Sequence, residues 1–399
     1  CIHCSLGCST ISGARYREIC RQESRLNESV NGFFICDRGR YGYQYENHRD
    51  RPRNAILDNK QVSFQKAEET AAERLRLILD QNGSSSVACL GSHRNSLETQ
   101  AALSRVCRLL DIPGPAFFID KAVGDKVKTA VNRLDRRNSV SMQEIESADF
   151  ILVLGADPVN EAPMLALAMR QARRNNAAIA VADPRPVTLP FDFEHFPVPV
   201  DSLGNFASAL LKNTFTREEV NGFSSEKRSF YENLEAEFPK KVETRQPERL
   251  CEKLKQSKKP VIICGTQIVD LNLPSLAADV VNFLRSNRVN PGLFYIMPGA
   301  NSFGAAFYDA SGKRSFMEIV RDIEAGKIKA LVTVESNPFF QFPNRKRFEK
   351  ALDRLELFLV LDYIPSPTVH RATVFIPSKT VFEAGRSEDH TPELQSLLI

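Results

Sequence analysis

Short apolar runs alternate along most of the chain with segments that have the periodicity of helices. Turn residues bound the runs, and nearly every position inside them is apolar. A continuous apolar run is typical of a strand buried on both faces of a parallel sheet. The runs, in chain order, are SVACL, FILVLG, AAIAVA, PVIICG, GLFYI, ALVTV, LFLVL and ATVFIP. Their alternation with helices predicts an α/β fold with two doubly wound, mostly parallel Rossmann-like sheets.

Two of the intervening segments give the clearest helix predictions. Residues 65–81 are amphipathic, and the Asn-Gly pair that follows them should end that helix. Residues 97–110 place Leu103, Val106 and Leu110 on one helical face. We expect this second face to be buried.

The first 58 residues have little helical periodicity. Residues 9–23 and 32–36 favour short antiparallel strands around several cysteines. A segment this short buries little apolar surface by itself, so we expect a bound metal to stabilise it.

The composition is that of an ordinary globular protein and gives no support to a nucleic-acid partner or to a membrane span. The 399 residues are 42% hydrophobic and 26% charged, which suits two or three domains with proper cores. The net charge of +4 argues neither for nor against a nucleic-acid partner, but no strongly basic tract supports one, so we expect none. No apolar run approaches the roughly 18 residues that a membrane-spanning helix needs, so we expect no direct membrane insertion.

Four cysteines near the start of the chain have the spacing of a metal site. Cys1, Cys4 and Cys8 lie within eight residues, and Cys36 follows in the run FFICDRGRYGY. Three thiolates on one tight loop and a distant fourth can each hold one iron of a cubane. We therefore predict a [4Fe-4S] cluster. A four-cysteine zinc site and a site without metal remain open as alternatives.

The other cysteines are expected to be small, buried hydrophobic residues. They are Cys20, Cys89, Cys107, Cys251 and Cys264. The odd total of nine, with four clustered, favours a reducing compartment and a metal site over a set of disulfides. A cluster with four thiolates is anionic, and arginines after the last ligand, Arg38 first among them, could offset that charge.

The cysteine segment resembles a known family. CIHCSLGC, followed by SVNGFFICDRGRYGYQYENHRDRPR, is similar to the start of the molybdopterin-oxidoreductase-like region in the large iron-sulfur subunits of bacterial NADH-quinone oxidoreductase, respiratory complex I. The later blocks VLGADP, VADPRP, KKPVIICGT, PGANSFG, VTVESNP and ATVFIPS follow in the family's order, up to about residue 385. The resemblance implies that Cys1, Cys4, Cys8 and Cys36 bind a [4Fe-4S] cluster.

The resemblance also implies a role and a location. The whole complex transfers electrons from NADH to quinone and translocates protons, whereas this part of one subunit would not be catalytic alone. Its implied partners are other subunits of the peripheral arm of complex I. Its implied location is cytoplasmic, on the inner membrane's cytoplasmic face through the complex.

The same resemblance implies how the chain is divided. Residues 1–58 would form a small β-rich [4Fe-4S] domain, followed by two Rossmann-like α/β domains of the molybdopterin oxidoreductase type. The first would combine residues 59–113 with 290–385, and the second would comprise 114–289. We expect 386–399 to be a non-native tail, because it resembles a translated sequencing adapter. We also expect the sequence to be a fragment whose native start is missing.

Molybdopterin-dependent enzymes such as formate dehydrogenases share this scaffold and provide the alternative function. Three features favour a scaffold without molybdopterin. The stretch FFIDKAVGDKVKTAVNRLDRR, where such enzymes place a metal ligand, contains no cysteine or serine, although Asp120 and Asp125 could serve. Arg38 stands where many of these enzymes have lysine, and VPVDSLGN lacks the Gly-Thr pair of their dinucleotide-binding turn.

Overall fold

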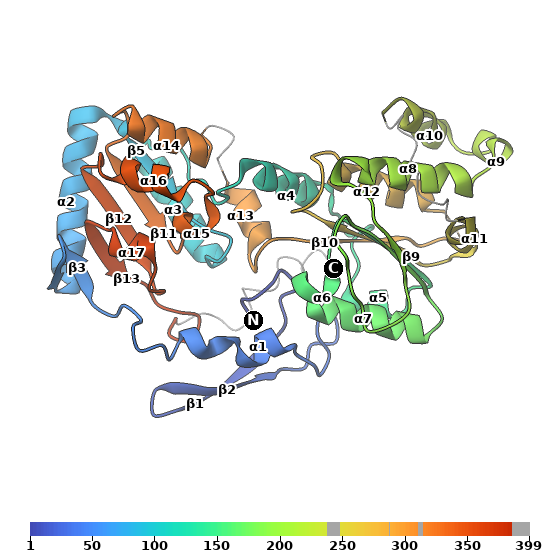
Figure 1. The fold of residues 1–399 in the computed structure, drawn as a ribbon, viewed down its shortest axis with the longest axis horizontal. Coiled ribbons are helices and arrows are strands. Elements are labelled where there is room, and N and C mark those ends of the chain that lie inside the picture. Colours follow the sequence, from blue (N-terminus) through green and yellow to red (C-terminus); the bar gives the residue numbers. More distant parts are fainter. Residues whose placement is uncertain (238–247, 287, 310–313, 385–399) are drawn as a thin grey trace.

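The computed structural model describes residues 1–237, 248–286, 288–309 and 314–384 (Figure 1). Two α/β lobes, each built around one sheet, stand side by side, and an N-terminal segment (residues 1–54) lies along one side of both (Figure 1). The tail predicted to be non-native, 386–399, lies outside these residues. No helix within the four described ranges has both the length and the apolar content needed to cross a bilayer.

The N-terminal segment begins with a loop and a hairpin. β1 (Thr10–Arg15) and β2 (Glu18–Ser24) pair antiparallel, so the strand prediction for residues 9–23 is confirmed. The helix α1 (Asp37–Tyr41) and the 3-10 turn η1 (Gly42–Tyr45) follow.

The strand predicted at residues 32–36 is wrong. Only an isolated bridge between Asn27 and Gly32 forms there. The buried Asn31 side chain donates to the carbonyl groups of Arg25 and Phe34, and its oxygen accepts from the amide of Ser9. The backbone of this loop is therefore satisfied by a side chain instead of a strand partner.

The first lobe contains a six-stranded sheet in the order β4-β3-β13-β12-β11-β5. Its four long strands are parallel, and β3 and β4 add an antiparallel edge. The strands are β3 (Ala55–Leu57), β4 (Lys60–Val62), β5 (Val87–Leu90), β11 (Ala330–Val334), β12 (Leu357–Asp362) and β13 (Val374–Pro377). The helical elements of this lobe are α2 (Phe64–Asn82), η2 (Ser84–Ser86), α3 (Leu97–Leu109), α14 (Phe316–Glu324), α15 (Pro338–Gln341), α16 (Arg345–Leu352) and α17 (Pro367–His370).

The second lobe contains a five-stranded, fully parallel sheet in the order β10-β9-β6-β7-β8. The strands are β6 (Phe150–Leu154), β7 (Ala178–Ala182), β8 (Glu194–Phe196), β9 (Pro260–Gly265) and β10 (Gly292–Ile296). The helical elements are α5 (Met142–Glu146), α6 (Pro158–Glu161), α7 (Pro163–Arg174), η3 (Val200–Ser202), α8 (Leu203–Thr214), α9 (Arg217–Asn221), α10 (Ser225–Glu237), α11 (Glu248–Gln256) and α12 (Leu273–Leu284). α4 (Lys121–Arg133) and α13 (Ser302–Tyr308) lie between the lobes (Figure 1). The prediction of an α/β fold with parallel sheets is confirmed.

Both predicted helices, α2 and α3, form at the expected positions, but the buried face of α3 differs from the prediction. α2 ends at Asn82, and Gly83 follows with a φ of 75° that favours glycine. In α3, Leu103 is buried as predicted, but Val106 and Leu110 are exposed. Gln100 takes the buried face instead, because its amide donates to backbone carbonyl groups of two neighbouring loops.

Two strands pair across the predicted domain boundaries. β3, inside the segment 1–58, pairs with β13 of the first sheet. β10, inside the segment 290–385, pairs with β9 of the second sheet. An apolar run indicates that a strand is buried, but it does not indicate which sheet the strand joins. The sheets to which β3 and β10 belong therefore became known only from the structure. The division into three domains otherwise stays a prediction.

Candidate metal centre

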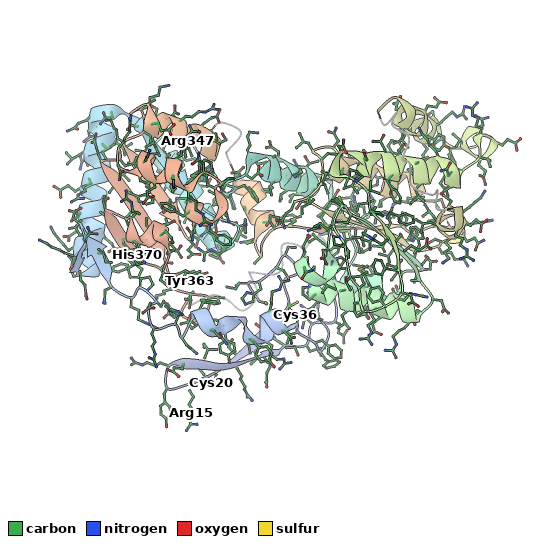
Figure 2. The ribbon with its side chains drawn as sticks, in the orientation of Figure 1. Arg15, Cys20, Cys36, Arg347, Tyr363 and His370 are labelled. Atoms are coloured by element: carbon green, nitrogen blue, oxygen red, sulfur yellow. The ribbon has the colours of Figure 1, made fainter. Side chains whose placement is uncertain are left out.

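The structure brings the four predicted cysteines to one small cavity. Cys1, Cys4 and Cys8 lie in the opening loop, and Cys36 is the residue just before α1. The other residues that line the cavity are His3, Ile35, Arg38, Pro163 and Met164. Figure 2 labels Cys36, which lies where the N-terminal segment meets the second lobe.

Local contacts close the opening loop on itself. The amino group of Cys1 donates to the carbonyl oxygen of Cys8 at 2.8 Å, and Gly7 adopts a φ of 74° inside the loop. The Ser5 hydroxyl accepts a hydrogen bond of 3.2 Å from the amide of Met297, directly after β10. The loop is therefore fixed both internally and against the second lobe.

Glycine in α1 lets Cys36 approach the opening loop. A Cβ atom at Gly39 would lie 2.5 Å from the Ile35 side chain and 3.5 Å from Cys1 Sγ. A Cβ atom at Gly42, just after α1, would lie 2.3 Å from His3 Nε2. The absence of these two side chains allows α1 to pack directly on the loop that carries the other three cysteines.

The cavity lies at the carboxyl edge of the second sheet. Pro163 and Met164 start α7, which follows β6 and the short helix α6. The Arg38 guanidinium donates to the carbonyl oxygen of Asn160 in α6. In open α/β sheets, ligands bind outside the carboxyl ends of the strands, so the cavity occupies an ordinary ligand position.

The cavity has an apolar side. Leu6, Cys8 and Met164 are buried in one hydrophobic cluster, against which the other three cysteines pack. Burial raises the pKa of the Cys4 and Cys8 thiols, that of Cys8 to about 12. The positive charge of Arg38 acts in the opposite direction on the pKa of Cys4. Burial therefore disfavours free thiolates in this cavity, whereas a metal that binds thiols deprotonates them.

Within the described residues, the four thiols line one cavity without the close spacing of a single-ion site. Within the described parts of the chain, no three His, Cys, Asp or Glu side chains converge closely enough for one metal ion. A tetrahedral zinc site with bonds of about 2.3 Å would require sulfur atoms about 3.8 Å apart. In a cubane each thiolate binds a different iron, which tolerates wider separation. Four thiols around one cavity are a donor set that both iron-sulfur clusters and zinc sites use.

The remaining cysteines are not equivalent to one another. Cys89, Cys107, Cys251 and Cys264 are buried, as predicted. Cys20 is exposed on β2, so that part of the prediction is wrong. In a two-stranded hairpin, successive side chains point to opposite faces, and one of these faces is exposed to solvent. The residues around Cys20 did not indicate that its side chain lies on the exposed face.

The two aspartates considered as molybdenum ligands have structural roles. Asp120 caps the N-terminus of α4 by accepting from the amide of Ala122. Asp125 pairs with Lys121 one turn earlier on the surface of the same helix. Neither contacts the cysteine cavity.

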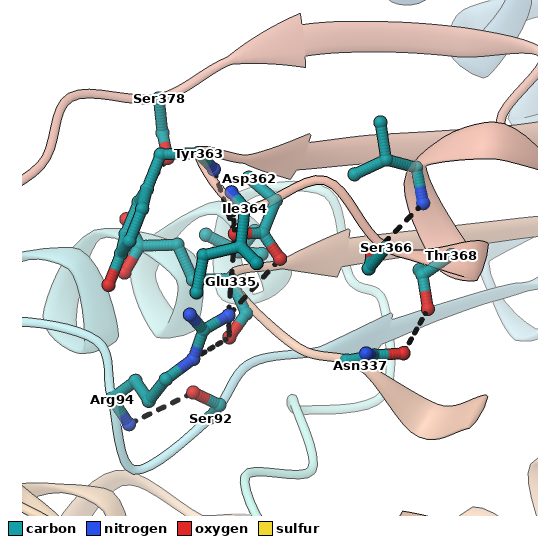
Figure 3. A network of polar contacts seen from close by, with 12 residues as sticks. Ser92, Arg94, Glu335, Asn337, Asp362, Tyr363, Ile364, Ser366, Thr368 and Ser378 are labelled. Atoms are coloured by element: carbon teal, nitrogen blue, oxygen red, sulfur yellow. Dashed lines mark hydrogen bonds and ion pairs between the residues drawn. The ribbon is translucent and has the colours of Figure 1, made fainter. Parts of the chain in front are cut away.

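A second polar group lies at the carboxyl edge of the first sheet and was missed by the sequence analysis (Figure 3). Arg94, after β5, donates twice to the carbonyl oxygen of Glu335 and pairs with Asp362. Burial raises the pKa of Asp362, which the charge of Arg94 partly opposes. Glu335 has a φ of 49°, a strained value for a residue with a side chain. The sequence did contain one signal for this polar group: an acidic residue, Glu335 or Asp362, stands at the end of each of two apolar strands.

This polar group also contacts the N-terminal segment. The ring of Tyr45, in η1, lies 5.8 Å from that of Tyr363, and the guanidinium of Arg94 lies 5.3 Å from the ring of Tyr363. The buried Arg51–Glu46 ion pair lies in the same segment, and Arg51 also pairs with Glu383 after β13.

Comparison with known proteins gives both a family and a fold. Residues 58–389 match the family model of molybdopterin oxidoreductases. Two curated relatives are NADH-quinone oxidoreductase subunits, both designated G: that of Pseudomonas putida is 28% identical over 401 residues, and that of Escherichia coli K12 is 28% identical over 409. These alignments cover 96% of this chain but only 42% and 43% of the relatives. The chain thus spans less than half the length of these curated relatives.

Two solved structures share the fold at low sequence identity. Acetylene hydratase from Pelobacter acetylenicus aligns with a TM-score of 0.57 and 13% identity, over 94% of this chain and 62% of that one. The formyltransferase/hydrolase complex from Methylorubrum extorquens aligns with a TM-score of 0.53 and 16% identity, over 84% and 88%. Since the family model matches well over half of its residues, the chain belongs to the molybdopterin oxidoreductase family.

Proposed function

We propose that the chain is part of the large iron-sulfur subunit of an NADH-quinone oxidoreductase and binds one [4Fe-4S] cluster through Cys1, Cys4, Cys8 and Cys36. The observation that carries the proposal is the single cavity lined by these four thiols. The names of the relatives, which are subunits of NADH-quinone oxidoreductases, support the assignment to that complex.

The residues around the cavity have distinct roles in this proposal. A bound [4Fe-4S] cluster supplies one-electron transfer. The closed loop of Cys1–Cys8 and the start of α1 hold the four thiolates in place, which lowers the ordering cost of binding. Leu6 and Met164 exclude water from one side, and Arg38 provides a positive charge beside an anionic site.

The proposal extends to the parent complex. As part of that complex the chain would contribute to electron transfer from NADH to quinone coupled to proton translocation, without being catalytic alone. Its partners would be other subunits of the peripheral arm. It would lie on the cytoplasmic face of the inner membrane through those subunits.

A molybdopterin-dependent oxidoreductase is the second candidate, because the family match includes such enzymes by name. Contacts among residues at the carboxyl edge of the first sheet support a scaffold without a bound dinucleotide there. Arg94 binds the carbonyl oxygen of Glu335 and the carboxylate of Asp362 across the ends of β5, β11 and β12. We therefore propose a scaffold that binds no molybdopterin.

Elemental analysis of the purified holoprotein separates these candidates. The proposal predicts four irons and four acid-labile sulfides per chain, with neither molybdenum nor tungsten. Iron together with molybdenum or tungsten would favour the second candidate. One zinc per chain without iron would reject both.

A further inference from the structure

The tip of the β1–β2 hairpin projects away from both lobes and carries an unusual set of side chains. Tyr16, at the tip, is 86% exposed, and the guanidinium of Arg15 lies 5.2 Å from its ring. Figure 2 shows Arg15 at the end of the hairpin, pointing away from the body of the molecule. Neither Arg15 nor Arg17 forms an ion pair within the described parts of the chain.

The turn at this tip is strained. Tyr16 and Arg17 are its two central residues, with φ values of 49° and 69°. A two-residue hairpin turn of this kind strongly prefers asparagine, aspartate and glycine, which tolerate positive φ. Stability alone would favour those residues, so the presence of tyrosine and arginine indicates that their side chains serve a contact.

A second exposed feature adjoins the hairpin. Phe33 and Phe34 are 74% and 61% exposed, in the loop that precedes Cys36. The Ser24 hydroxyl at the end of β2 donates to the carbonyl oxygen of Phe33, which fixes this loop against the hairpin. The two phenylalanines therefore lie beside the open end of the hairpin, and Tyr16 lies at its other end. We call the exposed hairpin tip and these two phenylalanines together the hairpin face.

The cations of the N-terminal segment are all arginine. Residues 1–54 contain nine arginines and no lysine. A merely solvated surface would use both, whereas protein–protein interfaces are enriched in arginine, tyrosine and phenylalanine and depleted in lysine. Arginine also pairs with carboxylates through two parallel hydrogen bonds, which lysine cannot do.

We propose that the hairpin face is a docking surface for an acidic region of another protein subunit, with Tyr16 as the inserted aromatic side chain and Arg15 and Arg17 as the carboxylate-binding groups. This inference rests on the proposed role of the chain as one subunit of a complex. An anionic lipid surface would be attracted by charge alone, and it would not require the strained turn or the two phenylalanines.

Photo-cross-linking in the assembled complex tests the inference. Tyr16 is replaced by p-benzoylphenylalanine in the full-length subunit, and the cross-linked peptides are identified after purification of the complex. We expect the cross-links to converge on one Asp- and Glu-rich segment of a single neighbouring subunit. The double variant Arg15→Glu/Arg17→Glu should reduce their yield about tenfold, since both carboxylate contacts are lost.

A matched charge reversal on the first lobe provides the control. Arg345→Glu/Lys346→Glu changes two exposed cations at the start of α16 and should leave the yield unchanged. Cross-links only within the subunit itself, or a yield that the Arg15 and Arg17 changes do not affect, would overturn the inference. So would binding of the subunit to phosphatidylserine vesicles without any cross-link to protein.

The iron content of the same samples keeps the two proposals separate. Normal iron without a cross-link would reject the docking surface and leave the cluster assignment intact. A cross-link to an acidic segment in a protein without iron would do the reverse.

Discussion

Arg94 and Asp362, 268 residues apart in the chain, form an ion pair of 3.1 Å in which the carboxylate is completely buried. The same guanidinium donates to the carbonyl oxygen of Glu335. Asp362 in turn accepts from the amides of Tyr363 and Ile364. One side chain after β5 thereby links the ends of β11 and β12 and closes the carboxyl edge of the first sheet.

Removing the positive charge of Arg94 while keeping Asp362 should destabilise the fold. Arg94→Met leaves a buried carboxylate without its partner and should lower the free energy of unfolding by about 2 to 4 kcal/mol. The double variant Arg94→Met/Asp362→Asn should recover most of that loss, because asparagine is neutral and still accepts from the two amides. Calorimetry of the first lobe's transition measures both effects. A double variant as unstable as the single one would show that the unpaired charge is not the cause.

The contact between Arg51 and Glu383 should make stability depend on pH. Burial is the largest influence on Glu383 and raises its pKa, but an amide of Thr380 and the charges of Arg51 and Arg53 together bring this pKa below its ordinary value of 4.5. A carboxyl group with a lowered folded pKa stabilises the fold above its unfolded pKa, and that contribution disappears as pH falls through the folded value.

Glu383→Gln should therefore lower stability by about 1 kcal/mol at pH 7, a figure reduced for partial exposure. The difference from the parent protein should vanish well below the ordinary pKa of 4.5. Melting temperatures of both proteins from neutral pH into acid measure it, with the exposed Glu28→Gln as a surface control. A gap that persists unchanged into acid would contradict this assignment.

The close packing of α1 should control metal binding without any change of ligand. Gly39→Ala would place a Cβ atom 2.5 Å from the Ile35 side chain and push that side chain into the cavity. We expect less iron per chain, even though alanine is the better helix former by about 1 kcal/mol. The double variant Gly39→Ala/Ile35→Ala should restore the iron content. Full iron in the single variant would mean that α1 can move away freely.

Arg38 should tune the reduction potential of a bound cluster. A nearby positive charge favours the reduced, more negative state, so Arg38→Met should lower the potential by about 20 to 40 mV. Arg38→Lys keeps the charge and should shift the potential less. Redox titration followed by electron paramagnetic resonance measures both variants, and an unchanged potential in Arg38→Met would place the charge too far from the cluster to matter.

Much of the fold could be predicted because a buried strand has to be apolar along its whole length. The runs at β6, β7, β9, β11 and β12 are buried almost throughout and stand out from the sequence for that reason. The four cysteines could be grouped because thiolates at that spacing have few other uses. That they ligate a cluster remains a prediction until the metal is measured.

What escaped prediction depends on contacts between distant residues. Asn31 satisfies its own loop, which removed the need for the strand expected there. Gln100 turns one face of α3 inward through bonds to loops that the helix pattern does not contain. The Arg94–Asp362 pair joins two polar residues that look like ordinary turn residues in the sequence. Hydrophobic periodicity indicates which positions are buried, but it carries no information about which distant residues a polar side chain contacts.

The most direct test of the cluster assignment compares two single cysteine variants of the holoprotein. Cys36→Ala removes one of the four thiols around the cavity, whereas Cys20→Ala removes an exposed thiol of the same segment. We predict that Cys20→Ala retains four irons and the paramagnetic signal of a reduced [4Fe-4S] cluster, and that Cys36→Ala loses both. An intact cluster in Cys36→Ala would contradict the assignment.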